Sequence, residues 1–196
     1  MTGAAETFAF TPEYDEKAKA YIARYPEGRH FSAVMPLLDL AQRQNGGWLN
    51  QAAMDYVASY LDMPTIRVYE VATFYTMYNL KPVGKVHVQV CTTTPCWLRG
   101  SDEIVETCKD VLGIGMGETT EDGMFTLGEV ECAGACVNAP VIQVGDDYYE
   151  DLDAASTKAM LEAFKRGDAL KAGPQNGRQT SAPDGGPTTL LEMGEG

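Results

Sequence analysis

The stretch VQVCTTTPCWLRGSDEIV, residues 88–105, reads as the end of a strand, two cysteines separated by four residues, and the start of a helix. Cys91 follows a valine-rich segment whose apolar and polar residues alternate, which is typical of a strand. Apolar residues recur at helical spacing over 101–112, so a helix is expected after the cysteine pair. Because a helix N-terminus stabilises anions, this stretch predicts thiolate chemistry at Cys91 and Cys96.

A second cysteine pair lies in ECAGACVNAP, residues 131–140, after the expected strand MFTLGEVEC. If the two strands are neighbours in one sheet, the loops that carry the two pairs lie at the same edge. Four thiolates, from Cys91, Cys96, Cys132 and Cys136, can then meet at one point. Four interpretations follow: disulfides, a thioredoxin-type dithiol, a structural zinc ion or a [2Fe–2S] cluster.

The interpretations differ in how well they fit the spacing and the setting. The N-terminus lacks the features of a secretory signal, so a reducing compartment is expected and disulfides are disfavoured. A redox dithiol prefers two residues between its cysteines, and these pairs are separated by four and three. Zinc accepts four thiolates at such spacings and remains open. The cluster is favoured because C-x4-C is a ferredoxin-type spacing and CAGAC lets backbone amides approach the sulfur atoms closely.

Five further side chains have simpler expectations. Cys108 lies on the apolar face of the helix over 101–112 and is predicted to be a core residue. His30 and His87 are isolated in the sequence and are not expected to be ligands. Trp97 is expected to pack inside, and Pro140 to begin a strand after an ordinary trans bond, with a cis bond as the alternative.

The chain as a whole predicts an α+β protein in three parts. Residues 1–82 form a helical region, with helices expected over 12–25, 32–44, 51–61 and from 64 to about 78. Residues 83–166 follow the order β-α-β-β-β-α, with a hairpin at Gly145–Asp146 and a last helix capped by Asp153. Residues 167–196 are rich in Gly and Pro and are expected to be a disordered, flexible tail.

Composition excludes several classes of function. The formal net charge of −13 disfavours binding to nucleic acid, and no apolar run is long enough for direct insertion into a membrane. The chain also lacks a Gly-rich dinucleotide motif, so it is not expected to bind NADH or FMN by itself.

Residues 46–100, from GGWLNQAAMDYV to CTTTPCWLRG, closely resemble the small [2Fe–2S] subunit of the NADH-oxidising module of respiratory complex I, an NADH:quinone oxidoreductase. ECAGACVNAPVIQVGDDYYEDLD, residues 131–153, resembles the same family, and the likeness runs from about Pro12 to Arg166. It implies a thioredoxin-like ferredoxin domain after an N-terminal helical region. It also implies one [2Fe–2S] cluster, with the family's ligands falling on Cys91, Cys96, Cys132 and Cys136.

The resemblance further implies partners and a place in the cell. The partners are a larger subunit that binds FMN and NADH, and the larger iron–sulfur subunit of the module. The cluster exchanges one electron with the flavin, and no catalytic residue is expected in this chain. The expected location is cytoplasmic, peripheral on the inner membrane of a bacterium through the complex.

Two alternatives are carried forward. Related subunits occur in NAD-linked hydrogenases and formate dehydrogenases, where the role is equivalent. A zinc-stabilised helix-turn-helix regulator is suggested by residues 48–75, but Arg67 is the only basic residue from Trp48 to Tyr78.

Overall fold

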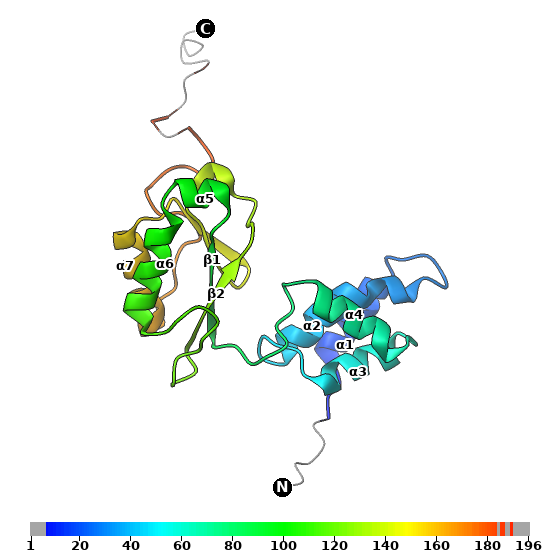
Figure 1. The fold of residues 1–196 in the computed structure, drawn as a ribbon. Helices are drawn as coiled ribbons and strands as arrows, with labels where there is room; N and C mark the ends of the chain where they lie inside the picture. Colours follow the sequence, from blue (N-terminus) through cyan, green and yellow to red (C-terminus); the bar gives the residue numbers. More distant parts are fainter. Residues whose placement is uncertain (1–6, 184, 187–188, 190–196) are drawn as a thin grey trace. The chain divides into compact units, whose positions relative to one another are not determined.

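A computed structural model describes residues 7–183, 185–186 and 189 of the 196-residue chain. The chain divides into two compact units, Met1–Val83 and Gly84–Gly196 (Figure 1). Each unit has its own hydrophobic core. The first unit is helical and the second combines a sheet with helices, which confirms the α+β class. Among the helices of the described residues, none has the length and apolar character to cross a lipid bilayer.

The described part of the first unit, residues 7–83, contains four α-helices and one short 3-10 helix. In chain order these are α1 (Pro12–Ile22), η1 (His30–Ala33), α2 (Val34–Gln44), α3 (Gln51–Tyr60) and α4 (Thr65–Phe74). α1 begins as predicted, because the Thr11 hydroxyl accepts the Tyr14 N–H at 3.5 Å and Pro12 occupies the first turn. It ends at Ile22, three residues earlier than expected, where the chain passes into turns.

Two helices of the first unit differ from the sequence prediction, α2 in where it begins and α4 in where it ends. The α-helix predicted from about Ser32 begins at Val34, because Pro36 has no N–H to donate to the Ser32 carbonyl. The last helix of the unit was expected to reach about Tyr78 but ends at Phe74. Tyr78 instead turns into the core, where it is 5% exposed and its hydroxyl donates to the Met35 carbonyl at 2.9 Å.

The core of the first unit is mainly aliphatic and closed to water. Its largest fully buried side chains are Leu37, Leu38, Leu49, Leu61, Val57 and Val68. Each contributes about 1.5–3 kcal/mol to folding by leaving water. This unit therefore has a hydrophobic core sufficient to be compact on its own.

Over its described residues, the second unit forms a five-stranded mixed sheet with helices on one face. Its elements are β1 (Val86–Cys91), α5 (Thr94–Leu98), α6 (Ser101–Leu112), β2 (Phe125–Val130), η2 (Cys136–Asn138), β3 (Ile142–Val144), β4 (Asp147–Glu150), α7 (Ala154–Arg166) and β5 (Gly173–Pro174). The strand order is β2-β1-β3-β4-β5, with β1 parallel to β2 and antiparallel to β3. Figure 1 shows α6 and α7 side by side on the same face of this sheet. The predicted order β-α-β-β-β-α is present, with α5, η2 and β5 as additions.

The alternation of β1 positions the core of the second unit. Val86, Val88 and Val90 point to the helical face, and His87 and Gln89 alternate to the other. The valines pack with residues of α6 and α7, of which the largest fully buried are Ile104 and Leu161. Because one face of β1 is buried, a slip of one residue against β2 is strongly disfavoured.

The tail after Gly167 departs from the expected disorder over its described part. β5 pairs with β4, which places Gly173 beside Tyr149 and Pro174 beside Glu150. β4 has an edge that offers unpaired backbone groups, and this short segment covers it. The rest of that expectation falls on residues 184, 187–188 and 190–196, which lie outside the described residues.

Gly84, just before β1, is a position where the sheet depends on glycine. A Cβ atom there would lie 2.7 Å from the Phe125 carbonyl carbon and 2.9 Å from the Met124 carbonyl oxygen, so the backbone would have to move. We expect Gly84→Ala to lower the free energy of unfolding by about 1–3 kcal/mol, measured by chemical denaturation. Gly115→Ala is the control, because its nearest neighbour is the flexible Glu118 side chain. Equal losses in both variants would contradict the proposed close approach at Gly84.

Asp153 supplies a cap whose contribution depends on pH. Its carboxylate accepts the Ser156 N–H at 2.7 Å, while the Ser156 hydroxyl accepts the Asp153 N–H at 2.9 Å. The side-chain hydrogen bond from Ser156 lowers the pKa of Asp153 below its usual 3.8. The usual value applies to the unfolded chain, so the cap stabilises the folded chain fully at pH values above it. This stabilisation is lost as pH falls through the lower pKa that Asp153 has in the folded chain.

We expect Asp153→Ala to lower the stability of the second unit by about 1 kcal/mol at pH 7, with the difference shrinking in acid. The check is thermal unfolding of wild type and variant across pH 2–7. Asp153→Asn is the control, since it keeps an uncharged cap acceptor and removes the titration. A difference between wild type and Asp153→Ala that stays constant down to pH 2 would refute a charged cap.

Candidate iron–sulfur site

The structure brings the two cysteine loops to one edge of the sheet. β1 and β2 run parallel, and Cys91 at the end of β1 pairs with Val130 at the end of β2. The residues that follow both strands therefore leave from the same edge, as the sequence predicts. The Cys91 thiol donates to the Glu131 carbonyl oxygen at 3.7 Å. This hydrogen bond links the end of β1 to the start of the second cysteine loop.

Cys91 and Cys96 form the buried half of this edge. They are 3% and 2% exposed and pack with Ala139 and Val141, with Ala133 and Ala135 at the margin. Cys96 is the third residue of α5, a short helix that was predicted only as a loop. Pro95 is suited to the first turn of that helix, because its missing N–H needs no partner there.

The two buried thiols are held in different electrostatic environments. Burial raises the pKa of Cys91, but hydrogen bonds from the backbone amides of Ala133 and Thr93, together with those from the Cys96 thiol and the Thr93 hydroxyl, bring that pKa below its usual value. Burial, together with the neighbouring Cys91, raises the pKa of Cys96 to about 12. The first negative charge of the pair therefore belongs on Cys91, where N–H groups from both loops face the sulfur.

Cys132 and Cys136 form the exposed half. They lie on a loop of small residues that turns at Gly134, whose φ of +76° is readily adopted only by glycine. Within the part of the chain that the structure describes, no three Cys, His, Asp or Glu side chains converge closely enough to hold a metal ion. The fold thus brings both pairs to one edge without closing the four sulfurs together.

The residues at this edge are chemically suited to an iron–sulfur cluster. The two loops offer four thiols, which are soft donors preferred by iron–sulfur clusters and by zinc. The amides directed at Cys91 stabilise a charged sulfur, and the alanines around it leave room for close approach of the backbone. That all four of these cysteines are cluster ligands remains a prediction.

A family model for the thioredoxin-like [2Fe–2S] ferredoxin matches residues 18–165. The chain belongs to this family. The match covers most of both units and includes all four cysteines of the edge. The thioredoxin-like ferredoxin assignment made from the sequence is thereby confirmed.

Curated relatives extend the likeness to nearly the whole chain. A subunit of the NADH-quinone oxidoreductase of Rickettsia prowazekii is 57% identical over 171 residues, covering 87% of this chain and 96% of that protein. The corresponding subunit from Rickettsia conorii is 63% identical over 145 residues, covering 74% and 87%. The mitochondrial NADH dehydrogenase [ubiquinone] flavoprotein 2 of Dictyostelium discoideum is 54% identical over 185 residues, covering 94% and 75%. This ferredoxin is therefore related over most of its length to a subunit of NADH:quinone oxidoreductase, as the resemblance in its sequence implies.

Among solved structures, an NAD+-reducing [NiFe]-hydrogenase in the air-oxidised state matches with a TM-score of 0.60 at 19% identity. The match covers 69% of this ferredoxin but 23% of the hydrogenase chain, so this ferredoxin spans about a quarter of that chain. At this identity the likeness bears on the fold alone.

Several residues considered from the sequence can now be placed. Cys108 is completely buried in α6, and burial raises its pKa to about 12, which confirms its role in the core. His87 lies on β1, where burial lowers its pKa, and His30 lies in the other unit. Neither belongs to a group of metal-ligating side chains among the described residues.

Two expectations near the cysteines were wrong. Trp97 was expected to pack inside but is 56% exposed, because it lies on the outer side of α5, where its indole N–H donates to the Asp102 carboxylate at 3.0 Å. The bond between Ala139 and Pro140 is cis rather than trans. A bond before proline has only a small preference for trans, so sequence alone decides it poorly.

Apolar side chains at the rim of the site were missed from the sequence. Leu98 is 71% exposed and Val137 is 65% exposed, and with Trp97 they lie next to Cys96 and Cys136 in the chain. Exposed large apolar residues beside a polar site are typical of a surface that contacts another protein. Their position in the sequence could have indicated them, because an apolar residue directly follows the second cysteine of each pair.

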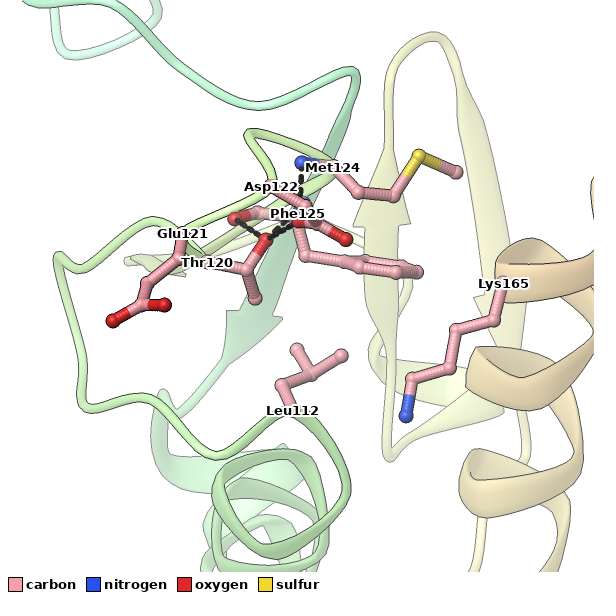
Figure 2. A pocket seen from close by; sticks show the side chains of 7 residues that line it. All are labelled: Leu112, Thr120, Glu121, Asp122, Met124, Phe125 and Lys165. Carbon is pink, nitrogen blue, oxygen red and sulfur yellow. Dashed lines mark hydrogen bonds between the residues drawn. The ribbon is translucent and has the colours of Figure 1, made fainter.

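A separate pocket lies near the start of β2, at the opposite end of that strand from the cysteine loop (Figure 2). It is lined by Leu112, Thr120, Glu121, Asp122, Met124, Phe125 and Lys165. Phe125 begins β2, whereas the cysteine loop follows the end of that strand. Asp122 accepts from Thr120 and from the Met124 N–H, and Lys165 donates to the Val111 carbonyl at 2.8 Å. These polar groups bond to the chain itself, so the cysteine edge is the candidate site.

The exposure of the cysteines predicts their order of alkylation in the reduced, metal-free chain. Iodoacetamide should modify Cys132 and Cys136 first, because they are exposed. Cys108 should react last, since it is completely buried and only its thiolate reacts. Mass spectrometry of timed digests measures this order, with the urea-unfolded chain as the control. Modification of Cys108 as fast as Cys136 in the folded chain would contradict the placement of these residues.

Proposed function

We propose that this ferredoxin binds one [2Fe–2S] cluster through Cys91, Cys96, Cys132 and Cys136. We propose further that the cluster exchanges one electron with the FMN of a partner subunit in NADH:quinone oxidoreductase. The observation that carries the proposal is the parallel pairing of β1 with β2, which brings both cysteine loops to one edge. The relatives from NADH-quinone oxidoreductase and NADH dehydrogenase, 54–63% identical over most of the chain, support the choice of complex.

The residues of this chain would hold the cluster and adjust its charge. A [2Fe–2S] cluster, when bound, accepts and releases one electron at a time. The Ala133 and Thr93 amides favour added negative charge at the Cys91 side and so favour reduction. Glu129 and Glu131 near the second loop act in the opposite direction. Burial of Cys91 and Cys96 excludes water from one side of the site.

Two features support the proposed partners: the chain has no dinucleotide-binding motif, and apolar side chains are exposed beside its cysteines. Without a Gly-rich dinucleotide motif, it depends on another subunit for NADH and FMN. The exposed Trp97, Leu98 and Val137 give that subunit an apolar surface beside the exposed cysteines. The larger iron–sulfur subunit of the module is the second proposed partner. Assembly with them would place the chain on the cytoplasmic side of a bacterial inner membrane.

The alternatives are less well supported. The likeness to a hydrogenase chain bears on the fold only, and a role in a hydrogenase or formate dehydrogenase has no relative of comparable identity among those described above. For a zinc-stabilised DNA-binding regulator, α3 and α4 do form a pair of helices. However, Arg67 on α4 pairs with Glu70, and the net charge of −13 opposes phosphate binding.

The proposal predicts a specific spectroscopic result. After anaerobic reconstitution with iron and sulfide, the chain should be coloured and should give a [2Fe–2S] EPR signal on reduction with dithionite. Cys91→Ser and Cys132→Ser should lose the signal or shift its g values, because a hydroxyl is a poor substitute for a thiolate ligand. In the complex with the flavin-binding subunit, NADH should reduce the cluster only when FMN is present.

Cys108→Ala is the matched control, since it removes a buried thiol of the same chain that is not a proposed ligand. Its signal should be unchanged, with stability lowered by about 1 kcal/mol. A colourless chain that holds one zinc ion would overturn the electron-transfer proposal. Loss of the signal in the Cys108 variant, with Cys91 and Cys132 variants normal, would overturn the ligand assignment.

A further inference from the structure

The described part of the tail from 173 to 182, here called the strap, runs from the sheet to the cysteine edge. It begins as β5 beside β4, and the Gln175 N–H continues the pairing by donating to the Glu150 carbonyl at 2.9 Å. In Figure 1 the orange segment after α7 returns along the second unit toward the end where α5 lies. The strap then reaches Asp151, the residue that follows β4.

Arg178 of the strap forms a buried ion pair with Asp151. The two side chains are 11% and 4% exposed. Both oxygens of the Asp151 carboxylate accept from the guanidinium, Oδ2 from Nε at 2.9 Å and Oδ1 from Nη2. This two-point geometry is available to arginine and not to lysine. Because both charges are shielded from water, loss of either one would leave the other buried without compensation.

The same groups hold the loop that carries Cys136. The Arg178 Nη2 atom also donates to the Val137 carbonyl at 3.1 Å. Asn138, which is 2% exposed, donates from its amide to the Thr180 carbonyl at 2.9 Å and to the Asp151 carboxylate at 3.3 Å. The Asn138 carbonyl accepts the Asp151 N–H at 2.7 Å. Val137 and Asn138 are thus fixed by the strap and by Asp151 together.

These contacts matter because the cysteine loop itself packs on the buried cysteines mainly through the small side chains of Ala133 and Ala135. Its residues between the two cysteines are Ala133, Gly134 and Ala135, which offer little side-chain surface for packing. Cys132 and Cys136 are exposed, whereas Asn138, two residues beyond Cys136, is buried. The buried end of the loop is therefore the end that the strap contacts.

We propose that the strap is a positioning element for the second cysteine pair, acting through Arg178 and Asp151. Arg178 holds the backbone of Val137 directly and, through Asp151, the side chain of Asn138. Cys136, in the same 3-10 turn, is thereby held in place as a ligand. This inference rests on the proposed function in one respect, that Cys136 is a cluster ligand.

The test uses the full chain and measures the order of the loop directly. Hydrogen–deuterium exchange of the metal-free chain should rise about tenfold or more over 132–138 in Arg178→Gln and in Asp151→Asn, because charge-assisted hydrogen bonds are lost. Asn suits position 151, since it tolerates the φ of +51° found there. Arg178→Lys should give a smaller rise, because lysine keeps the charge and loses the two-point geometry. In the reconstituted chain, the first two variants should release iron to a chelator several-fold faster than wild type.

Arg166→Gln is the matched control, since Arg166 pairs with Asp168 on the surface, where the side chains are 61% and 49% exposed. It should leave exchange over 132–138 and iron release unchanged, and exchange in α6 should be unchanged in every variant. Exchange that rises over 173–182 but not over 132–138 would overturn the positioning role. An equal rise of exchange in α6 in Arg178→Gln, Asp151→Asn and Arg178→Lys would also overturn it, because the effect would then be general destabilisation. If wild type binds no cluster, the proposed function fails, while the exchange measurement still decides whether the strap orders the loop.

Discussion

Six backbone pairs join β1 to β2, from Val86 with Phe125 to Cys91 with Val130, and the cysteine edge depends on them. Parallel strands end at the same edge, so the chain leaves both strands close together. If the two strands were antiparallel, the loops would be separated by the length of a strand, roughly 20 Å for six residues. The valines of β1 and Leu127 of β2, buried against the helices, hold this pairing in register. Hydrophobic burial on one face of the sheet thus determines which thiols can share a site.

The candidate site is asymmetric, and the asymmetry follows from the elements that carry the cysteines. Cys91 and Cys96 lie on a strand end and a helix, where the backbone is already fixed and the side chains are buried. Cys132 and Cys136 are exposed on a loop of small residues, of which Ala133 and Ala135 pack against the buried pair. A one-electron carrier needs both properties, since one side must exclude water and the other must lie close to a partner. The strap reconciles them by ordering the exposed side from outside the core.

Local signals predicted much of this fold. The cap at Asp153 marks a helix that the structure contains, and the valine alternation marks β1. Likewise, the placement of both cysteine pairs directly after strands was sufficient to predict a shared edge. These features depend on residues close together in the sequence, where propensity and periodicity are informative.

The remaining features depend on contacts between distant residues, which a local pattern does not encode. Tyr78 leaves the helical pattern because its hydroxyl is satisfied by Met35, 43 residues earlier. The strap is ordered because Arg178 meets Asp151, 27 residues earlier, although its Gly- and Pro-rich composition is typical of disorder.

The surface of the chain combines two properties that oppose each other in a free protein. A net charge of −13 favours solubility, yet large apolar side chains remain exposed in both units, with Phe74 at 76% and Met77 at 52% in the first and Leu98 at 71% in the second. Single exposed apolar residues are common, but Trp97, Leu98 and Val137 of the second unit each lie within two residues of Cys96 or Cys136 in the chain. Charge that keeps the chain soluble before assembly, and apolar residues that another subunit covers afterwards, are together consistent with a ferredoxin that works as part of a larger complex. On this view the cysteine edge is completed by its partner, which would shield the exposed pair that the fold of this chain leaves open to water.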